Sequence, residues 1–309
     1  MNKEPLWANQ SPLARFWLLI LIFTFCFFVF SFISTLVILP FADIKNLQNI
    51  EKLTDFNNPH LLTGLKIAQF ISAIGIFIIP AYLFSVFTTK NKSEFFKINK
   101  KPSFFWLMMG VLIMLTAQPL INWMGELNQK LVLPHFMNGI EHWMKGAEES
   151  ASKLTEAFLV MKTPGDLIVN LIMIALFAAL GEELFFRGTV QRVLTDVTKN
   201  TDKAIWISAI LFSAMHFQFY GFLPRMMMGV MLGYLFLWSG SLWVPIMAHF
   251  TNNALAVVVN YLSQKGIIST NIEYIGTTES YTTSTIISFI VVSGLLFLTY
   301  NYRKKKQME

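Results

Sequence analysis

Long apolar runs, separated by shorter polar connections, dominate this chain of 309 residues. A helix that crosses a bilayer core needs about 20 mostly apolar residues, and eight stretches approach that length. They cover roughly Phe16–Leu39, Leu61–Phe87, Phe104–Met124, Leu167–Phe186, Ala204–Phe219, Phe222–Trp238, Leu242–Leu262 and Thr285–Tyr302. The fifth and sixth stretches are short and form either one hairpin or one broken helix. The pattern predicts an all-α, polytopic membrane bundle of about eight transmembrane helices, with residues 1–309 as a single integral membrane domain.

The composition excludes other classes of protein. Hydrophobic residues make up 54% of the chain and charged residues 14%, whereas a soluble domain has about 25% charged residues. So few charges do not cover a water-facing surface, and a disordered chain needs low hydrophobicity. Cys26 is the only cysteine, which excludes a disulfide-stapled domain. The net charge of +6 fits membrane topology and gives no reason to expect a nucleic-acid partner.

Lysine and arginine gather in connections that lie on one side of the membrane if there are eight spans. They are Lys90, Lys92, Lys97, Lys100 and Lys101 after the second span, Arg187, Arg192, Lys199 and Lys203 after the fourth, and Arg303, Lys304, Lys305 and Lys306 in the tail. The loop after the first span is balanced, with Asp43, Lys45, Glu51, Lys52 and Asp55. The positive-inside rule therefore predicts a multi-pass cell-membrane protein with both termini in the cytoplasm.

The stretch Gly125–Asp166 is too long for a bare connection. Apolar side chains recur within it among glutamates and lysines: Ile140, Trp143, Met144, Leu154, Phe158 and Leu159. This pattern indicates one or two amphipathic helices on the outer surface. Such a helix is either a lid or lateral gate over a cavity, or a surface helix that only covers the bundle.

Ionisable side chains at membrane depth are costly, at about 2.5–3.5 kcal/mol each by insertion scales. Glu182, Glu183, His216 and His249 stand out at such positions. Glu183 and Arg187, four residues apart, can pair on one helix face, so the two carboxylates should not titrate alike, an asymmetry that suits a general base beside a structural partner. The alternative is a salt bridge at the cytoplasmic end of the span with one exposed glutamate.

The two histidines lie on the fifth and seventh spans. His216 follows Phe212 by four residues, and His249 precedes Asn253 by one helical turn. Donors that converge in a dry site stabilise a developing oxyanion; the alternatives are hydrogen-bonded core histidines and helix–helix hydrogen bonds. Since Glu182 is expected near the cytoplasmic end of its span, the histidines reach its level only by tilt or a displaced boundary. Gly229 and Gly233 form a close-packing step.

Three ordered motifs carry a resemblance: Glu182-Glu183-x-x-x-Arg187, Phe212-x-x-x-His216 and His249-x-x-x-Asn253. Their order and spacing resemble the CAAX protease and bacteriocin-processing (CPBP, or Abi) family of intramembrane proteases, with a core at residues 165–263. The resemblance implies an intramembrane endopeptidase in which Glu182 is the general base and His216 shares water activation and protonates the leaving amine. His249 and Asn253 then form the oxyanion hole, while Glu183, Arg187 and Phe212 organise the site.

The resemblance leaves the cofactor open. A glutamate-dependent mechanism requires none, but the family has also been called a metalloprotease, and zinc would then be held by Glu182, His216 and His249. The chain lacks His-Glu-x-x-His. We expect a cavity open toward the cytoplasm and a peptide or protein substrate, for instance a C-terminal tail, met within the bilayer. The alternative function is a non-enzymatic transporter, immunity or scaffold protein with a structural polar cluster.

Overall fold

The computed structural model describes residues 4–42, 58–131, 133–268 and 282–308, and the regular elements within them are all helical. The α-helices are α1 (Pro12–Ile38), α3 (Pro59–Ala73), α4 (Ile79–Thr88), α5 (Lys92–Phe95), α6 (Phe104–Thr116), α7 (Gln118–Gln129), α8 (Asn138–Phe158), α9 (Pro164–Asn170), α10 (Ala178–Phe185), α11 (Gln191–Thr198), α12 (Thr201–Ala214), α13 (Phe222–Ser239), α14 (Trp243–Gln264) and α15 (Thr282–Met308). Short 3₁₀ turns are η1 (Leu39–Phe41), η4 (His135–Met137) and η7 (Phe219–Gly221), and π-helical segments are η3 (Ile74–Ile78), η5 (Leu171–Phe177) and η6 (Phe186–Val190). The predicted all-α fold is confirmed.

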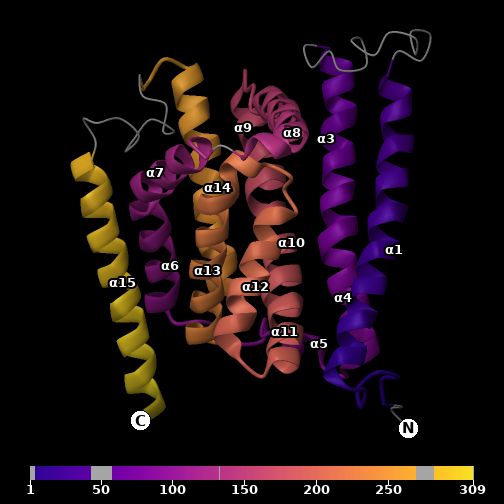
Figure 1. Cartoon of the computed structure of the whole chain (residues 1–309), viewed down its shortest axis with the longest axis vertical. Coiled ribbons are helices and arrows are strands. Elements are labelled where there is room, and N and C mark those ends of the chain that lie inside the picture. Colours follow the sequence, from indigo (N-terminus) through magenta and orange to yellow (C-terminus); the bar gives the residue numbers. More distant parts are fainter. Residues whose placement is uncertain (1–3, 43–57, 132, 269–281, 309) are drawn as a thin grey trace.

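Most of the long helices run side by side along one axis (Figure 1). Five helical stretches of the described residues are long and apolar enough to cross a membrane: Pro12–Phe41, Pro59–Thr88, Pro164–Thr198, Phe219–Ser239 and Thr283–Gln307. The pair α6 and α7 makes a sixth if its 46° bend lies within one span. Pro119 follows the bend directly and cannot donate a backbone hydrogen bond to the preceding turn. This is a polytopic helical membrane bundle.

The sequence predicts about eight transmembrane helices, whereas five, or six with the bent pair, meet the length and hydropathy of a span among the described residues. All eight predicted stretches contain helix, but two do not meet the length and hydropathy that define a span in the part of the chain described. The helix α12 has only 14 residues because it ends at Ala214. The 22-residue α14 is long enough, but it carries the polar side chains of His249, Asn252 and Asn253 near its middle. Two of these polar residues, His249 and Asn253, are ones that the sequence singles out as candidate site residues.

The fourth helical run is longer than predicted. It begins at Thr163, whose side chain caps the helix while Asp166 returns the bond, and it continues through η5 and η6 to Thr198. Glu182 therefore lies near the middle of the run, and the expectation that the glutamates end the span is wrong. Sixteen residues separate Glu182 from Thr198, and fifteen separate Thr201 from His216. At 1.5 Å per residue both distances are roughly 22–24 Å, so Glu182 and His216 reach the same level.

The predicted amphipathic helix is present as α8, which lies across one end of the bundle (Figure 1). The side-chain amide of buried Asn170 donates to the Phe158 carbonyl at the end of α8, over 2.8 Å. On the other side, Trp143 stacks at 5.3 Å on Phe219, and the Tyr220 amide donates to Glu148. The helix is thus attached to the connection that follows His216.

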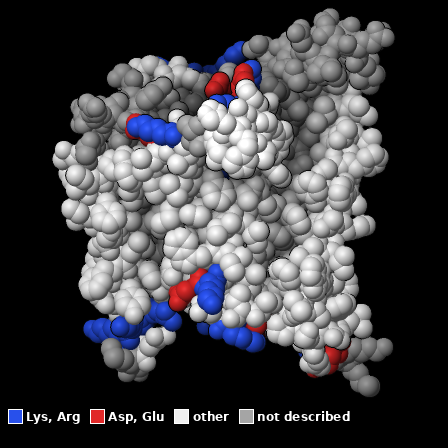
Figure 2. Space-filling model, viewed as in Figure 1, with Lys and Arg blue, Asp and Glu red and all other residues white. Residues whose placement is uncertain are grey.

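The start of α1 and the end of α15 lie at the same end of the bundle, opposite α8 (Figure 1). Lysine and arginine side chains gather at that end (Figure 2), as the charge pattern predicts. Two residues were misplaced by that pattern: Arg187, which is 1% exposed, and Arg192 on α11 lie inside the fourth helical run and do not belong to a basic loop. The balanced loop with Asp43, Lys45, Glu51, Lys52 and Asp55 lies outside the described residues. Which end faces the cytoplasm stays a prediction.

That orientation is testable with cysteine labelling, because Cys26 is buried and replaceable by serine. In a Cys26→Ser background, we expect Lys304→Cys to be protected from a membrane-impermeant maleimide in intact cells. Lys153→Cys on α8 should be labelled without lysis. The reverse pattern, read by gel shift before and after lysis, would contradict the predicted topology.

Close packing of α1 against the second helical run depends on Gly75. A Cβ there would lie 1.9 Å from Cγ of Phe30, near the rigid base of that side chain. Overpacking costs about 1–3 kcal/mol, so Gly75→Ala should lower the unfolding temperature in detergent. Gly139→Ala, where nothing lies within 4 Å, is the matched control and should leave that temperature unchanged or slightly higher. An unaltered temperature for Gly75→Ala would contradict this packing.

Candidate active site

Glu183 is the centre of a buried polar cluster. Its side chain is inaccessible to solvent, and its Oε1 accepts from Nη1 of Arg187 over 2.7 Å, one helical turn away. The same Oε1 lies 2.8 Å from Nδ1 of His249 on α14. A buried charge requires a partner of opposite sign, and this carboxylate has one cation and one imidazole. The predicted Glu183–Arg187 pair is present, and it is structural in position because it is sealed from water.

Arg187 connects the cluster to two further helices, α12 and α13. Its Nη2 donates over 2.9 Å to the carbonyl of Gly229 on α13, and its guanidinium lies 4.7 Å from the centre of the Phe212 ring on α12. A cation over an aromatic face is attracted by the ring quadrupole. The guanidinium is therefore held on two sides by fixed groups, which fixes the Glu183 carboxylate in turn.

Phe212 separates and orients the two histidines. Its ring contacts His216 at 5.1 Å and His249 at 5.9 Å between ring centres, both edge to face. The carbonyl of Phe212 belongs to the last turn of α12, where helix carbonyls lack intrahelical partners. Nδ1 of His216 lies 2.8 Å from that carbonyl. A neutral imidazole that donates from Nδ1 has its lone pair on Nε2, so this contact leaves Nε2 of His216 as a proton acceptor.

Glu182 lies between the two imidazoles. Its Oε2 is 3.9 Å from Nε2 of His216 and 3.8 Å from Nε2 of His249. These distances are too long for direct hydrogen bonds, and Oε2 is buried without any other hydrogen-bond partner. The His216 side chain is 28% exposed and the His249 side chain 3%, so the cluster is accessible from the His216 side. The spacing is one that a single water molecule can bridge.

The structure thus brings together six of the seven residues that the sequence singles out: Glu182, Glu183, Arg187, Phe212, His216 and His249. The seventh, Asn253, lies one turn beyond His249 on α14 and donates from Nδ2 to the carbonyl of Ile174 over 3.4 Å. That carbonyl belongs to the π-helical segment η5. The described contacts place Asn253 beside the cluster's helices and give it no direct bond to the other six.

Sequence reasoning missed the groups that support these residues. Gln118 at the bend after α6 donates to Asn252 over 3.0 Å, and Asn252 donates to Asn253. Gly229 was expected to serve packing alone, yet its carbonyl is a partner of Arg187. A Cβ at Gly229 would lie 3.0 Å from Cβ of Ala209, so glycine is also what lets α12 and α13 approach. Of these supporting groups, only Gln118 could have been noticed in the sequence, because it is a polar residue within an apolar stretch.

The backbone around the cluster is unusual at two points. Glu182 and Glu183 lie on α10 between the π-helical segments η5 and η6, and such segments are frequent at functional sites. Phe217, directly after His216, adopts a left-handed conformation with φ of 52°. Bulky residues rarely adopt this conformation, and it costs of the order of 1–3 kcal/mol. The surrounding contacts therefore offset the conformational free energy that this turn after His216 costs.

Zinc is predicted to be held by Glu182, His216 and His249. In the described ranges no group of three or more His, Cys, Asp or Glu side chains is arranged to hold an ion. Within the trio, one carboxylate oxygen of Glu182 lies 3.8–3.9 Å from the two Nε2 atoms. Nδ1 of His249 lies 2.8 Å from Glu183, as the outer partner of a ligating histidine also would. The described residues form no arranged metal site, and the zinc trio stays a prediction.

Comparison with known proteins identifies the segment that carries the cluster. Residues 164–255 match the model of a family described as type II CAAX prenyl endopeptidase Rce1-like. The resemblance predicted from the motifs is confirmed. This Rce1-like segment includes the fourth helical run, α12, α13 and the first half of α14, and therefore all seven candidate residues.

A curated relative gives weaker support. An uncharacterized protein, YpbD of Bacillus subtilis (strain 168), is 30% identical over 92 residues, or 28% of this chain. The chain spans less than half of that relative, 44% of its length. No solved structure matches the chain. The likeness to this relative thus covers only part of either chain.

The Glu183–Arg187 pair makes a testable claim about stability. Removing one partner of a buried ion pair costs about 3–5 kcal/mol because the other charge is left unpaired. Arg187→Met and Glu183→Met should each lower the unfolding temperature in detergent. The double variant should be less destabilised than the sum of the two, since it buries no lone charge. Additive losses would show that the two side chains do not interact.

Proposed function

We propose that the protein is an intramembrane endopeptidase that hydrolyses a peptide bond with a water molecule activated by Glu182 and His216. One observation carries the proposal: a buried carboxylate oxygen of Glu182, without a hydrogen-bond partner, faces Nε2 of two imidazoles at 3.8 and 3.9 Å. Buried polar atoms in native proteins are nearly always hydrogen-bonded. An orphaned oxygen between two proton carriers is therefore a place for a reacting molecule. The match to the Rce1-like family supports this choice of chemistry.

In the proposed reaction Glu182 is the general base. It accepts a proton from a water bound between Oε2 and Nε2 of His216, and the water oxygen attacks the scissile carbonyl. His216 contributes its Nε2 lone pair, because its Nδ1 is bonded to the Phe212 carbonyl. The proton then passes to the leaving amine through His216. The new carboxyl and amine groups account for both hydrogen atoms of the water.

His249 and Asn253 are proposed to stabilise the oxyanion. For His249 this role requires a proton on Nε2. Since Nδ1 donates to Glu183 over 2.8 Å, donation from Nε2 as well requires a doubly protonated ring, and the carboxylate that faces this Nε2 is Glu182, at 3.8 Å. Asn253 holds the Ile174 carbonyl by a long bond of 3.4 Å. A developing negative charge is a stronger acceptor than a neutral carbonyl, so the Asn253 amide can turn to it.

The expected cavity open toward the cytoplasm stays a prediction, because which end of the bundle faces the cytoplasm is itself a prediction. The more exposed histidine, His216, lies at the end of α12 that leads to α8. The connection after His216 contacts α8 through Trp143 and Glu148. We therefore propose that the substrate, a peptide tail or a protein segment in the bilayer, enters at this end. The helix α8 would then act as the cover of the site.

The second candidate is a non-enzymatic transporter, immunity or scaffold protein. The observation in its favour is the complete set of partners around Arg187, which accounts for a structural role of the Glu183 half of the cluster. Glu182 separates the two functions. A scaffold has no use for the charge of Glu182 and would tolerate Glu182→Gln, whereas a general base cannot be replaced by an amide.

The reaction predicts loss of activity with retention of fold. Purified protein should cleave members of an internally quenched peptide library with free C-termini. Glu182→Gln and His216→Ala should each reduce kcat by about 10²–10⁴, while membrane insertion and unfolding temperature stay near those of the parent. Glu149→Gln on α8, an exposed glutamate paired only with Lys153, is the matched control and should remain active.

A chelator added to the same assay tests the metal. We expect EDTA or 1,10-phenanthroline to leave cleavage unchanged. Loss of activity on chelation with recovery on added zinc would contradict the metal-free mechanism. Equal activity of the parent and both site variants would reject the enzyme and leave the scaffold.

A further inference from the structure

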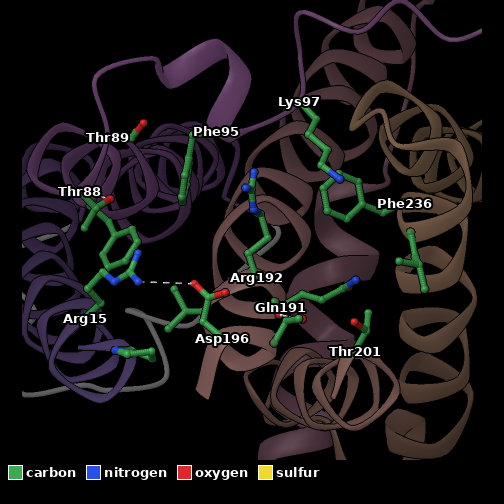
Figure 3. Close-up of a pocket in the computed structure, with 15 residues that line it drawn as sticks. Arg15, Thr88, Thr89, Phe95, Lys97, Gln191, Arg192, Asp196, Thr201 and Phe236 are labelled. Carbon is green, nitrogen blue, oxygen red and sulfur yellow. Dashed lines mark hydrogen bonds and ion pairs between the residues drawn. The ribbon is translucent and has the colours of Figure 1, made fainter. Parts of the chain in front are cut away.

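A polar cavity lies away from the candidate active site, at the basic end of the bundle. Its volume is about 430 Å³, within the range of small-molecule sites. It is enclosed by α1, α4, α5, α11, α12 and α13, and Figure 3 shows Arg15, Lys97, Arg192 and Asp196 around it. None of the seven candidate active-site residues lines it.

The charges in this cavity do not balance. Three cationic side chains line it, Arg15, Lys97 and Arg192, against one carboxylate, Asp196. The contact between Arg15 and Asp196 is long, 3.9 Å. Burial, together with the charges of Arg192 and Lys100, lowers the pKa of Lys97. Like charges held together in a partly buried cavity attract an anion.

Donor atoms are available as well as charge. Nη1 of Arg192 and Nε of Arg15 are buried without a hydrogen-bond partner. Arg192 is kept in place by the ring of Phe95, 4.7 Å from its guanidinium carbon, so its free donors are fixed in direction (Figure 3). Buried donors of this kind normally find an acceptor. The cavity therefore offers directed N–H groups from two different helices.

The backbone also holds Lys97 in an unusual way. Lys97 is left-handed, with φ of 55°, and its ammonium lies 5.3 Å from the ring centre of Phe236. A lysine that served only to mark the cytoplasmic side would extend into water. Lys97 instead lies against an aromatic ring at the cavity wall. Phe84, Phe95 and Leu237 give the same cavity apolar walls.

We propose that this cavity binds a phosphate group, carried by an anionic lipid or by a small phosphorylated molecule. Guanidinium groups match phosphate oxygens in shape and charge, and basic pockets between membrane helices are suited to lipid headgroups. The phosphate lies between Arg15, Lys97 and Arg192, and the apolar walls receive the carbon part of its carrier. This site is independent of the proposed protease reaction.

Binding is tested with the full-length protein and defined probes. In phosphatidylcholine nanodiscs, the protein is titrated with dioleoyl phosphatidylglycerol, and bound lipid is counted by native mass spectrometry. In detergent, inorganic phosphate and glycerol 3-phosphate are titrated by calorimetry. We expect saturable binding that Arg192→Gln and Lys97→Gln each weaken about tenfold or more, as loss of a charged hydrogen bond does. Lys203→Gln, an exposed cation at the same end outside the cavity, is the matched control and should bind as the parent does.

The outcomes identify the source of the phosphate or overturn the proposal. Binding of phosphatidylglycerol alone assigns the phosphate to a lipid, and binding of glycerol 3-phosphate or inorganic phosphate assigns it to a soluble molecule. Lack of binding by the parent to all three probes overturns the proposal, as does equal binding by parent and Lys97→Gln. Lys97 is half-buried, so this variant keeps the test valid if Arg192→Gln fails to fold; unfolding temperature serves as the check.

Discussion

One buried carboxylate constrains the arrangement of four helical segments. Glu183 on α10 is fully enclosed, and an enclosed charge must be paired. Arg187 supplies the charge, and it is itself held by a carbonyl of α13 and a ring of α12. His249 brings α14 to the same oxygen. Shifting any one of these helices along its axis would leave a buried charge or donor unpaired, so the pair sets the mutual level of the helices that carry the chemistry.

The proposed reaction uses the groups that the Glu183–Arg187 pair does not engage, namely Glu182 and the Nε2 atoms of the two histidines. Glu183 accepts from Nδ1 of His249, and the Phe212 carbonyl in the last turn of α12 accepts from Nδ1 of His216, while the two Nε2 atoms both face Glu182. The neighbouring glutamates are thereby given different tasks by position alone: Oε1 of Glu183 is paired with Arg187 and His249, while Oε2 of Glu182 faces two imidazoles without a direct hydrogen bond, beside the partly exposed His216. A pair of acids in different surroundings is a frequent arrangement in acid–base catalysis.

Sequence predicted the chemistry of this site better than its depth. Polar side chains at membrane depth stand out against apolar neighbours, so the motif residues were identifiable, and the i, i+4 spacing correctly paired Glu183 with Arg187. The apolar run stops near Phe186, however, and hydropathy could not show that the helix continues to Thr198 with Arg187 buried inside it. Nor could it show that Gly229, predicted to serve close packing, also accepts a hydrogen bond from Arg187 through its backbone carbonyl. Contacts between helices, which no local pattern encodes, decided these points.

The assembly around Glu183 can be observed directly through the histidine nitrogens. In protein labelled with ¹⁵N-histidine, with signals assigned through single histidine variants, Glu183→Gln should shift Nδ1 of His249 strongly, because it removes the charge that accepts its hydrogen bond. Nδ1 of His216, bonded to the Phe212 carbonyl, should change little. A His249 signal indifferent to Glu183→Gln would show that the buried carboxylate does not hold this imidazole, and the account of the site would fail with it.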